Sequence, residues 1–275
     1  MKTFVLAALL SGLVMTSFAQ TDTTVAKSDT IRIGGMIIVK KPGKDGKESR
    51  EVIISKRRRS SLSNVSTNWW IVDLGFANYK DETNFAAAQQ SGFVTSGISG
   101  KDNLKLRTGK SVNVNIWVFM QKLNIARHYV NLKYGLGVEL NNYRFDDERV
   151  RFTKNPTTVG IDPALANADK NKLAADYVTV PVMLNFNFTP KRYRAFGFSV
   201  GMSAGYLYSS RQKIKMDGDK DKLKDDFNLE KFKISYIAEL NLGPVKLYGS
   251  MATKNMWEKG LDQTPYNLGI RLSSF

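Results

Sequence analysis

The 275-residue sequence contains no cysteine and one histidine, His128. Without cysteine, disulfide bonds, thiolate catalysis and cysteine-ligated zinc sites are all excluded. A single imidazole leaves little for histidine chemistry. After residue 19, no uncharged apolar run approaches the roughly 20 residues that a membrane helix requires, so a helical membrane protein is excluded as well.

Acidic residues are few relative to basic ones. The chain has 41 Lys and Arg against 25 Asp and Glu, which gives a formal net charge of +16. This surplus favours an anionic partner such as nucleic acid, lipid or a polymer, but it informs association rather than fold. The hydrophobic fraction of 42% excludes a disordered tail, and the length allows one or two domains with a sizeable core.

The first residues have the composition of a secretory signal peptide. Lys2 precedes the apolar stretch 4–15, and residues 17–19 (Ser-Phe-Ala) place small side chains before a cleavage site. The stretch is too short to span a bilayer, and Gln20 rather than Cys follows the cut, which disfavours a lipid anchor. We therefore predict that residues 1–19 are removed and that the mature chain is exported; a buried N-terminal helix is the alternative.

The mature chain shows a period-two alternation of apolar and polar residues, which indicates β-strands. Between Tyr129 and Leu140 the even-numbered positions are apolar, whereas the odd-numbered ones after Tyr129 are Asn, Lys, Gly or Glu. In the preceding segment, Met120 is expected on the apolar face, opposite Trp117. Eight strands are predicted: Trp69–Tyr79, Val112–Met120, Tyr129–Leu140, Val178–Phe188, Phe196–Tyr208, Phe232–Leu242, Val245–Trp257 and Tyr266–Phe275. An even number suits a closed outer-membrane barrel.

A soluble barrel with inward apolar residues would alternate in the same way, but three features favour a membrane barrel. The polar faces carry small residues that suit a narrow interior. Long connections (80–110, 146–174, 211–228 and 258–265) alternate with short turns, as external loops and periplasmic turns do. Aromatic residues gather near strand ends, as two membrane interfaces favour. One rim is predicted to hold Trp70, Tyr129, Phe188 and Tyr193, and the other Tyr79, Tyr143, Tyr177, Tyr208, Trp257 and Tyr266.

Three motifs resemble the PorT-like outer-membrane β-barrel proteins of Bacteroidetes-type bacteria. They are YVTVPVML at 177–184, the hairpin LNLGPV at 240–245, and YNLGIR at 266–271 with the terminal Phe275. The resemblance covers residues 68–275, and its motifs are general to barrels. It implies insertion by the outer-membrane assembly machinery, which reads the last strand and its terminal aromatic residue, here Phe275. It implies a location more than a task.

The predicted fold is all-β: an eight-stranded antiparallel up-and-down transmembrane barrel over residues 68–275, with both termini in the periplasm. Inward charges in a narrow lumen should pair across it and fill it, because unpaired buried charges are costly. The predicted lumen charge network comprises Asp73, Lys133, Glu139, Lys233, Glu239, Lys246, Lys254 and Arg271. A general porin is therefore not expected; a cation-binding or conducting lumen is the alternative.

Residues 20–67 are predicted to form a basic periplasmic extension that carries a β-hairpin. Apolar segments at 31–33, 36–39 and 52–54 flank the turn sequence 42–46 (Pro-Gly-Lys-Asp-Gly). The hairpin could cover the periplasmic barrel mouth or pair with a partner protein. Positive charge would collect on a basic periplasmic rim formed by Arg57, Arg58, Arg59, Arg127, Lys191, Arg192 and Arg194. Anionic lipid headgroups attract such residues; a linker whose charge prevents aggregation is the alternative.

No sequence pattern favours catalysis, a metal or a cofactor. His128 lies beside Arg127 at a predicted short turn, which favours a rim histidine over a general base. Residues 217–221 (Asp-Gly-Asp-Lys-Asp) match part of a calcium loop but lack its glycine at position six and glutamate at position twelve, so a solvated loop is the better interpretation. Residues 162–176 could form a short capped helix with proline at its first position.

The expected function is a structural or interaction role at the cell envelope, as an outer-membrane barrel with a filled lumen. The expected partners are outer-membrane lipid, the assembly machinery during insertion and a periplasmic protein, but not nucleic acid. An accessory role in a secretion or envelope assembly complex is one alternative, suggested by the hairpin and the basic rim. A soluble periplasmic ligand-binding barrel is the other, and an enzyme that uses His128 ranks behind both.

Overall fold

The computed structural model describes residues 30–33, 36–42, 48–54, 62–95, 97–190, 196–243 and 245–272. The chain divides into two compact units, residues 1–61 and 62–275, which are treated separately below. The predicted signal peptide lies outside the described residues. Within the described ranges, no helix is both long and apolar enough to cross a membrane.

The first unit contains a small antiparallel sheet in the order β1-β2-β3. Its strands are β1 (Thr30–Ile33), β2 (Met36–Pro42) and β3 (Glu48–Ile54). Pairing of β2 with β3 runs from Met36 opposite Ile54 to Pro42 opposite Glu48. This is the hairpin expected around the Pro-Gly turn sequence, and β1 adds a third strand to it.

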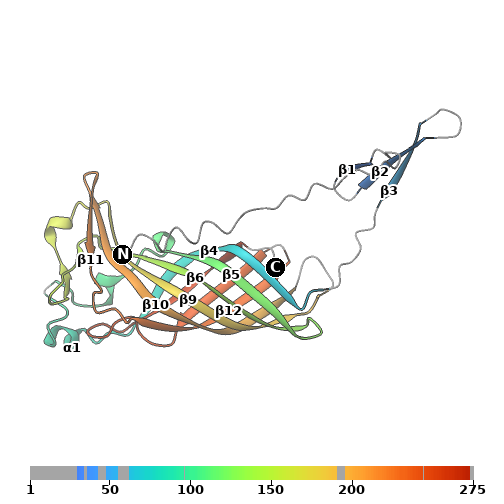
Figure 1. Ribbon diagram of the computed structural model, residues 1–275. Coiled ribbons are helices and arrows are strands. Elements are labelled where there is room, and N and C mark those ends of the chain that lie inside the picture. The colour runs from blue at the N-terminus through green and yellow to red at the C-terminus, as the bar shows by residue number, and fades with distance from the viewer. Residues whose placement is uncertain are drawn as a thin grey trace, which may run out of the picture. The chain divides into compact units, whose positions relative to one another are not determined.

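The second unit is built on a ring of eight antiparallel strands (Figure 1). Each strand pairs with the next along the ring, β14 pairs with β4, and β9 pairs directly with β10. The ring confirms the prediction of eight antiparallel strands in up-and-down order. Its members are β4 (Val65–Asp81), β5 (Val112–Ala126), β6 (Val130–Arg144), β9 (Lys170–Asn187), β10 (Phe196–Met216), β12 (Phe232–Leu242), β13 (Val245–Ala252) and β14 (Gln263–Leu272).

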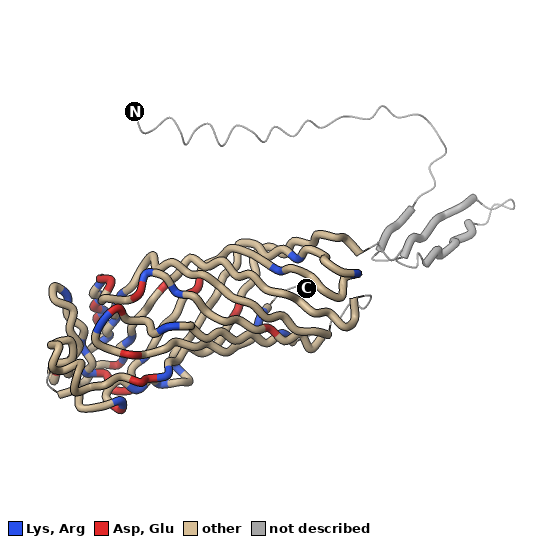
Figure 2. Tube along the Cα trace, turned by 90° about the horizontal axis from the view of Figure 1, so that it is seen from below, with Lys and Arg blue, Asp and Glu red and all other residues tan. Residues whose placement is uncertain are grey.

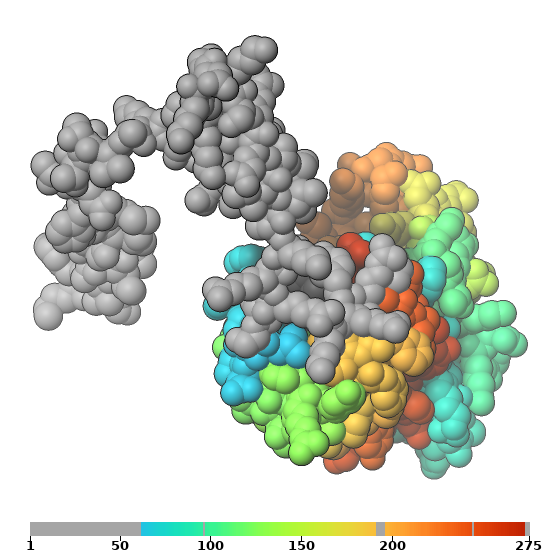
Figure 3. All heavy atoms as spheres, turned by 90° about the vertical axis from the view of Figure 1, so that its right-hand side faces the viewer, coloured from blue at the N-terminus to red at the C-terminus, as the bar shows by residue number. Residues whose placement is uncertain are grey.

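The long connections contain short elements of their own at one end of the ring. They are α1 (Phe85–Gln90), the 3₁₀ turns η1 (Lys101–Leu104), η2 (Thr108–Lys110) and η3 (Pro163–Leu165), and the strand pair β7 (Val150–Phe152) and β8 (Val159–Ile161). Figure 3 views the second unit from the opposite end, where β4 (cyan) lies next to β5 (green), as their pairing requires, and β5 pairs in turn with β6. The long connections therefore share one end of the ring.

The predicted loop at 211–228 is wrong, because β10 continues to Met216 and forms a hairpin with β11 (Asp219–Lys224). Asp217 and Gly218 have φ angles of 50° and 89° at this turn. A two-residue hairpin turn of type I′ needs positive φ at both of its central residues, and Asp-Gly is a preferred sequence for it. The Asp-Gly pair was therefore a turn signal, not a fragment of a calcium loop.

The helix expected over residues 162–176 is reduced to η3. Asp162 caps it by accepting a hydrogen bond from the backbone N–H of Ala164, and Pro163 occupies its first position. From Lys170 onward the chain is strand β9 instead, paired with β6 on one side and β10 on the other. Strand pairing on both sides outweighs the local helix signal.

Side chains alternate between the two sides of the ring, with apolar groups outward and polar groups inward. On β9, for example, Thr179 is 1% exposed, whereas its neighbours Val178 and Val180 are 41% and 44% exposed. In β5 a bulge between Trp117 and Phe119 shifts the alternation, so that Trp117 and Met120 are both buried. The expectation that Met120 lies on the apolar outer face is therefore wrong.

Three of the aromatic residues expected at the rim nearest the long connections are interior residues. Tyr143 and Tyr177 are buried because they share the inward parity of Glu139 and Thr179 on their strands. Trp257 is buried because β13 ends at Ala252 and the chain then turns inward. Tyr79 is half-buried, whereas Tyr208 and Tyr266 are exposed as predicted. At the other rim Trp70, Tyr129 and Phe188 are exposed, and Tyr193 lies outside the described residues.

Glycine on the inner side of β10 permits close contact with β9, and this contact predicts a stability effect. A Cβ atom at Gly201 would overlap the carbonyl oxygen of Val182 and lie 2.6 Å from the Cα of Met183, whereas one at Gly249 would meet nothing closer than 3.7 Å. We expect Gly201→Ala to lower the free energy of unfolding by about 1–3 kcal/mol and Gly249→Ala to change it by less than about 0.5 kcal/mol. Urea unfolding of refolded protein in detergent measures both, and equal midpoints would contradict the prediction.

Candidate functional site

Asp73 of β4 anchors a network of buried charges inside the ring. Its Oδ1 accepts a hydrogen bond from Arg271 Nε at 2.6 Å, and its Oδ2 accepts one from Arg271 Nη2 at 2.7 Å. Trp117 Nε1 and Asn115 Nδ2 also donate to Oδ2, at 2.7 and 3.2 Å. Two parallel N–H···O bonds to one carboxylate fix both the position and the orientation of the guanidinium group.

Arg271 extends this pairing across the ring. Its Nη1 donates to Glu239 of β12, whose second oxygen accepts from Lys133 of β6. The guanidinium carbon also lies 5.6 Å from the centre of the Trp117 ring. Two carboxylates and two cations therefore alternate in one chain of contacts that joins β4, β14, β12 and β6 and carries no net formal charge.

A second ion pair joins Glu139 of β6 to Lys233 of β12. Glu139 Oε1 also accepts hydrogen bonds from Asn141 Nδ2 at 3.2 Å and from Asn267 Nδ2 at 3.1 Å. The Lys233 ammonium lies 4.4 Å from the centre of the Tyr177 ring. These partners take the place of the water that a charged pair would lose on burial.

Asn113 connects the two charged groups. Its Nδ2 donates to Asn115 Oδ1 at 3.0 Å and to Asn141 Oδ1 at 2.9 Å, and its own Oδ1 accepts from the Tyr248 hydroxyl. A continuous set of hydrogen bonds therefore runs from Asp73 to Glu139. Asparagine suits this role because its side chain both donates and accepts.

Seven of the eight residues predicted for the lumen charge network are buried inside the ring: Asp73, Lys133, Glu139, Lys233, Glu239, Lys246 and Arg271. Lys254 is the exception. The predicted strand continued to Trp257, but β13 ends at Ala252 and Lys254 is exposed. The assignment of Lys254 to the interior is wrong because the period-two pattern extends past the end of the strand.

Little space remains around Arg271, whereas a cavity of about 160 Å³ nearer the cap end is lined in part by Tyr177, Lys233 and Met256. A cavity of about 30 Å³ lies among Trp117, Met183 and Arg271, together with their neighbours. This volume is about that of one water molecule in the liquid. Beside it, the buried side chains of Ile71, Trp117, Met120 and Met183 form a small apolar cluster. The interior is thus filled by polar and apolar side chains together.

The long connections form an apolar cap at their end of the ring. Phe152 stacks on Trp257, with ring centroids 5.5 Å apart and planes 13° from parallel, and it also contacts Phe145 and Phe227. Phe93 meets the edge of Trp257 at 5.9 Å. Each of the four long connections contributes at least one of these five rings. The loops therefore share one core and are not independent surface segments.

The sequence did not predict this cap, because no pattern of residues in the long connections indicated a shared core. Its only sequence signal is the presence of isolated aromatic residues in otherwise polar segments, as at Phe152 and Phe227. Isolated residues have no periodicity, so no pattern distinguishes them from exposed loop residues. Their burial arises from contacts between loops distant in sequence.

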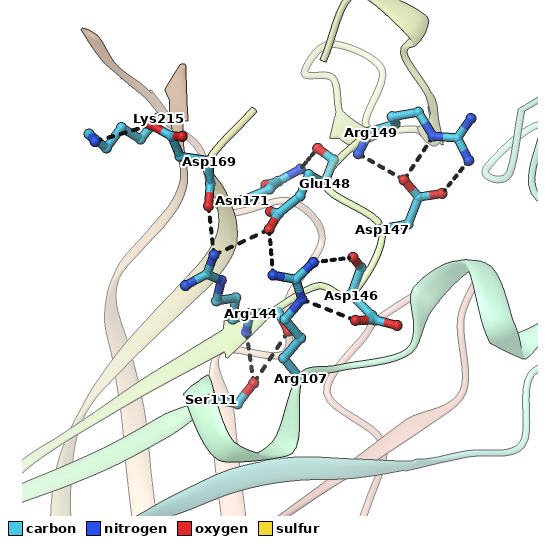
Figure 4. A network of polar contacts seen from close by, with 10 residues as sticks. All are labelled: Arg107, Ser111, Arg144, Asp146, Asp147, Glu148, Arg149, Asp169, Asn171 and Lys215. Atoms are coloured by element: carbon cyan, nitrogen blue, oxygen red, sulfur yellow. Dashed lines mark hydrogen bonds and ion pairs between the residues drawn. The ribbon is translucent and has the colours of Figure 1, made fainter. Parts of the chain in front are cut away.

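Charged residues are frequent in the connections that form the cap, and Figure 2 shows Lys, Arg, Asp and Glu positions gathered at this end of the described ring. Arg107 contacts both Asp146, with Nε 3.0 Å from Oδ1, and Glu148, with Nη1 3.2 Å from Oε1 (Figure 4). Arg144 Nη2 also lies 3.2 Å from Glu148 Oε1. Hydrogen bonds from the Arg149 guanidinium lower the pKa of the Asp147 carboxyl. These contacts fix the start of the connection between β6 and β9.

Of the predicted basic rim, the structure describes Arg127. It lies in the turn between β5 and β6 with a φ angle of 46°, and its side chain is exposed. His128 follows with a φ angle of 61°, and its backbone N–H donates to Asn124 Oδ1. The other rim residues, Arg57, Arg58, Arg59, Lys191, Arg192 and Arg194, and the assembly residue Phe275 lie outside the described residues.

Within the described ranges, no group of three or more His, Cys, Asp or Glu side chains is arranged to hold a metal ion. What the interior does provide is a set of balanced ion pairs inside a ring whose outer face is apolar. Residues 76–250 match the outer membrane protein beta-barrel domain family, from β4 to β13 and over more than half of the chain. The chain belongs to this family. No curated protein is similar enough to be identified as a relative.

Family membership makes this protein an outer-membrane β-barrel protein, in agreement with its ring of eight strands. The matched segment carries five of the seven buried charges of the interior; Asp73 precedes it on β4, and Arg271 follows it on β14. Most of the charges that fill the ring therefore lie within the segment that matches the family.

The interior network predicts a large effect for loss of Arg271. Replacement with Met leaves Asp73 and Glu239 buried without their shared cation, so we expect Arg271→Met to lower the free energy of unfolding by about 3–5 kcal/mol. The control is Lys80→Met, which removes an exposed ion pair with Glu82 and should cost less than about 1 kcal/mol. Denaturant unfolding in detergent micelles measures both. A loss below 1 kcal/mol for Arg271→Met would show that the network does not stabilise the barrel.

Proposed function

We propose that the protein spans the bacterial outer membrane through its eight-stranded ring, with both termini in the periplasm. The observation that carries this proposal is the inverted distribution of side chains. Large apolar groups such as Phe232, Leu268 and Tyr236 are 72%, 62% and 61% exposed, whereas the charged groups of the same strands are buried. Hydrocarbon is the solvent in which such a surface is stable.

The apolar outer surface continues from strand to strand, and we call it the apolar belt. Soluble monomeric proteins rarely expose an apolar patch larger than about 300–600 Å². A soluble periplasmic barrel would place these side chains inside, around a ligand cavity. The belt therefore favours the membrane barrel over the soluble alternative. Its residues include Leu74, Phe76, Val178, Val180, Val182, Leu184, Val200, Met202, Ile234, Leu240, Leu268 and Ile270.

Within the membrane we propose a structural or interaction role, not that of a general porin. The ion pairs across the ring and the aromatic cap over one end support it, because together they occupy the path that a solute would follow. We also propose that the protein is not an enzyme. Asp73, Glu139 and Glu239 are each held by a cation, which disfavours a free general base.

An accessory role in a secretion or envelope assembly complex is the second candidate. The sheet of β1, β2 and β3 forms a unit of its own outside the barrel unit, and a small sheet has edges to which another chain can add a strand. The PorT-like resemblance implies a location rather than a task, so this second candidate is supported by the small sheet alone.

A charge placed on the apolar belt tests membrane insertion. Val182 lies in the middle of the outward residues of β9, so Val182→Arg should cost about 2–4 kcal/mol in lipid vesicles, the penalty at mid-bilayer. Tyr208→Arg, at a similarly exposed position near the end of the belt, should cost about 0–1 kcal/mol. Unfolding from vesicles measures the two costs. Equal small costs would contradict a membrane location.

The filled interior predicts low conductance. Purified protein in planar bilayers should show no large steady current, because ion pairs cross the ring and the space left around Arg271 is on the scale of a single water molecule. The same preparation should show heat-modifiable gel mobility, which demonstrates that folded barrel is present. A steady porin-like conductance from such a preparation would contradict the filled lumen.

A further inference from the structure

Beyond the apolar belt, strands β9, β10 and β11 continue as a three-stranded extension. Its outer side bears six lysines, which we call the lysine face: Lys170, Lys172, Lys213, Lys215, Lys220 and Lys222. The extension lies at the end of the ring that carries the long connections (Figure 1). Arg211 of β10 and Lys224 of β11, directly opposite each other, lie between the lysine face and the belt.

The strand register aligns the six lysines in two rows of three. Lys215 lies directly opposite Lys170 on one side and Lys220 on the other. In the second row, Lys213 lies directly opposite Lys172 on one side and Lys222 on the other. Like charges directly opposite each other on neighbouring strands are destabilising. The extension therefore maintains an arrangement that is unfavourable unless an anion is present.

Acidic side chains neutralise only part of this charge. Lys215 Nζ lies 3.1 Å from Asp169 Oδ2, and Arg211 pairs with Asp176. Lys172 donates to the amide oxygen of Asn142. Among the described residues, no ion pair is formed by Lys170, Lys213, Lys220 or Lys222.

The lysines line a groove of about 320 Å³, the volume of roughly ten water molecules. The carboxylate in its lining, Asp221, lies 3.7 Å from Arg151. Lys172 lies beyond the apolar belt, where burial and the neighbouring cations Lys170, Lys213 and Arg211 lower its pKa to about 8. An ammonium group held with a reduced pKa gains most from a nearby anion.

The nearer row of the lysine face, which contains Lys213, lies within the reach of a lysine side chain from the headgroup layer of a bilayer. Tyr208 is the last exposed aromatic residue of β10, and Arg211 follows three residues later. At about 3.3 Å per residue and a strand tilt of about 40°, Arg211 lies roughly 8 Å and Lys213 roughly 13 Å beyond Tyr208. The polar layer of each leaflet is about 5–8 Å deep, and lysine side chains can extend back toward it.

We propose that the lysine face binds the phosphate groups of anionic lipids in the adjoining leaflet, so that the barrel carries its own lipid partner at this rim. The inference rests on the proposed membrane location. Its distinctive support is the continuity of one surface: the outward side of β10 presents apolar groups, then the aromatic Tyr208, then the cations Arg211, Lys213 and Lys215. A phosphorylated lipid presents the complementary order of acyl chain, interface and phosphate.

The experiment measures binding of short-chain phosphatidic acid and short-chain phosphatidylcholine to the full chain in detergent micelles. Wild type should bind phosphatidic acid at least about tenfold more tightly. The triple variant K172Q/K213Q/K222Q should weaken that binding by about ten- to a hundredfold, because each lysine near a lipid surface adds to the attraction of the anionic phosphate. The triple variant K172R/K213R/K222R keeps the charge and should bind like wild type.

The matched control is K105Q/K154Q/K259Q, which removes the same charge from exposed lysines of the other long connections and should change binding by less than about twofold. Heat-modifiable mobility shows that every variant is folded. Equal binding by the two glutamine triples would overturn the proposal, and so would inorganic phosphate that competes as well as phosphatidic acid. Because binding is measured in micelles, a failure of the barrel to insert into vesicles would count against the proposed function alone.

Discussion

The structure depends on one constraint, which arises because the apolar side chains of the ring point outward. Every polar group that points inward must find a partner inside the ring. Asp73, Arg271, Glu239 and Lys133 meet this constraint as a chain of alternating charges, and Asn113 extends it by hydrogen bonds toward Glu139. Such a network is costly when it is incomplete, because a buried charge without a partner loses its hydration and gains nothing. The eight strands and their interior residues are therefore one cooperative unit.

The aromatic cap solves a different problem at one end of the ring. The four connections at this end are long. Ordering a long loop costs conformational entropy, and a loop that packs against nothing has no contacts to offset that cost. Phe152 and Trp257 bring segments from different connections together, and Gln212 of β10 fixes the same region by accepting from the Phe152 N–H at 3.0 Å and donating to the Val150 carbonyl oxygen at 2.9 Å. The cap thus gives the loops an apolar core of their own, continuous with the inner side of the ring.

The sequence predicted the strands well because inward and outward positions differ in polarity along each of them. Seven interior charges followed from the same parity, since residues such as Glu139 and Glu239 share the inward positions of their strands with the other polar residues. Parity failed where the backbone departs from regular pairing: at the β5 bulge, which buries Met120, and after Ala252, where Lys254 and Trp257 leave the strand. The cap and the lysine face were not predictable in this way. The first depends on contacts between distant loops, and the second on the register of β9, β10 and β11.

The cap and the lysine face are two sides of one sheet extension. Ile214 and Met216 of β10 pack inward with Leu165 and Ala168, and Leu223 of β11 packs against the cap. On the other side of the same strands the lysines lie in register. Apolar packing on the inner side offsets the repulsion between the outward lysines and holds them in two rows before any anion is bound. A site arranged in advance loses less entropy on binding than one assembled by its ligand. The filling of one end of the ring and the arrangement of cations at that rim are therefore consequences of the same packing.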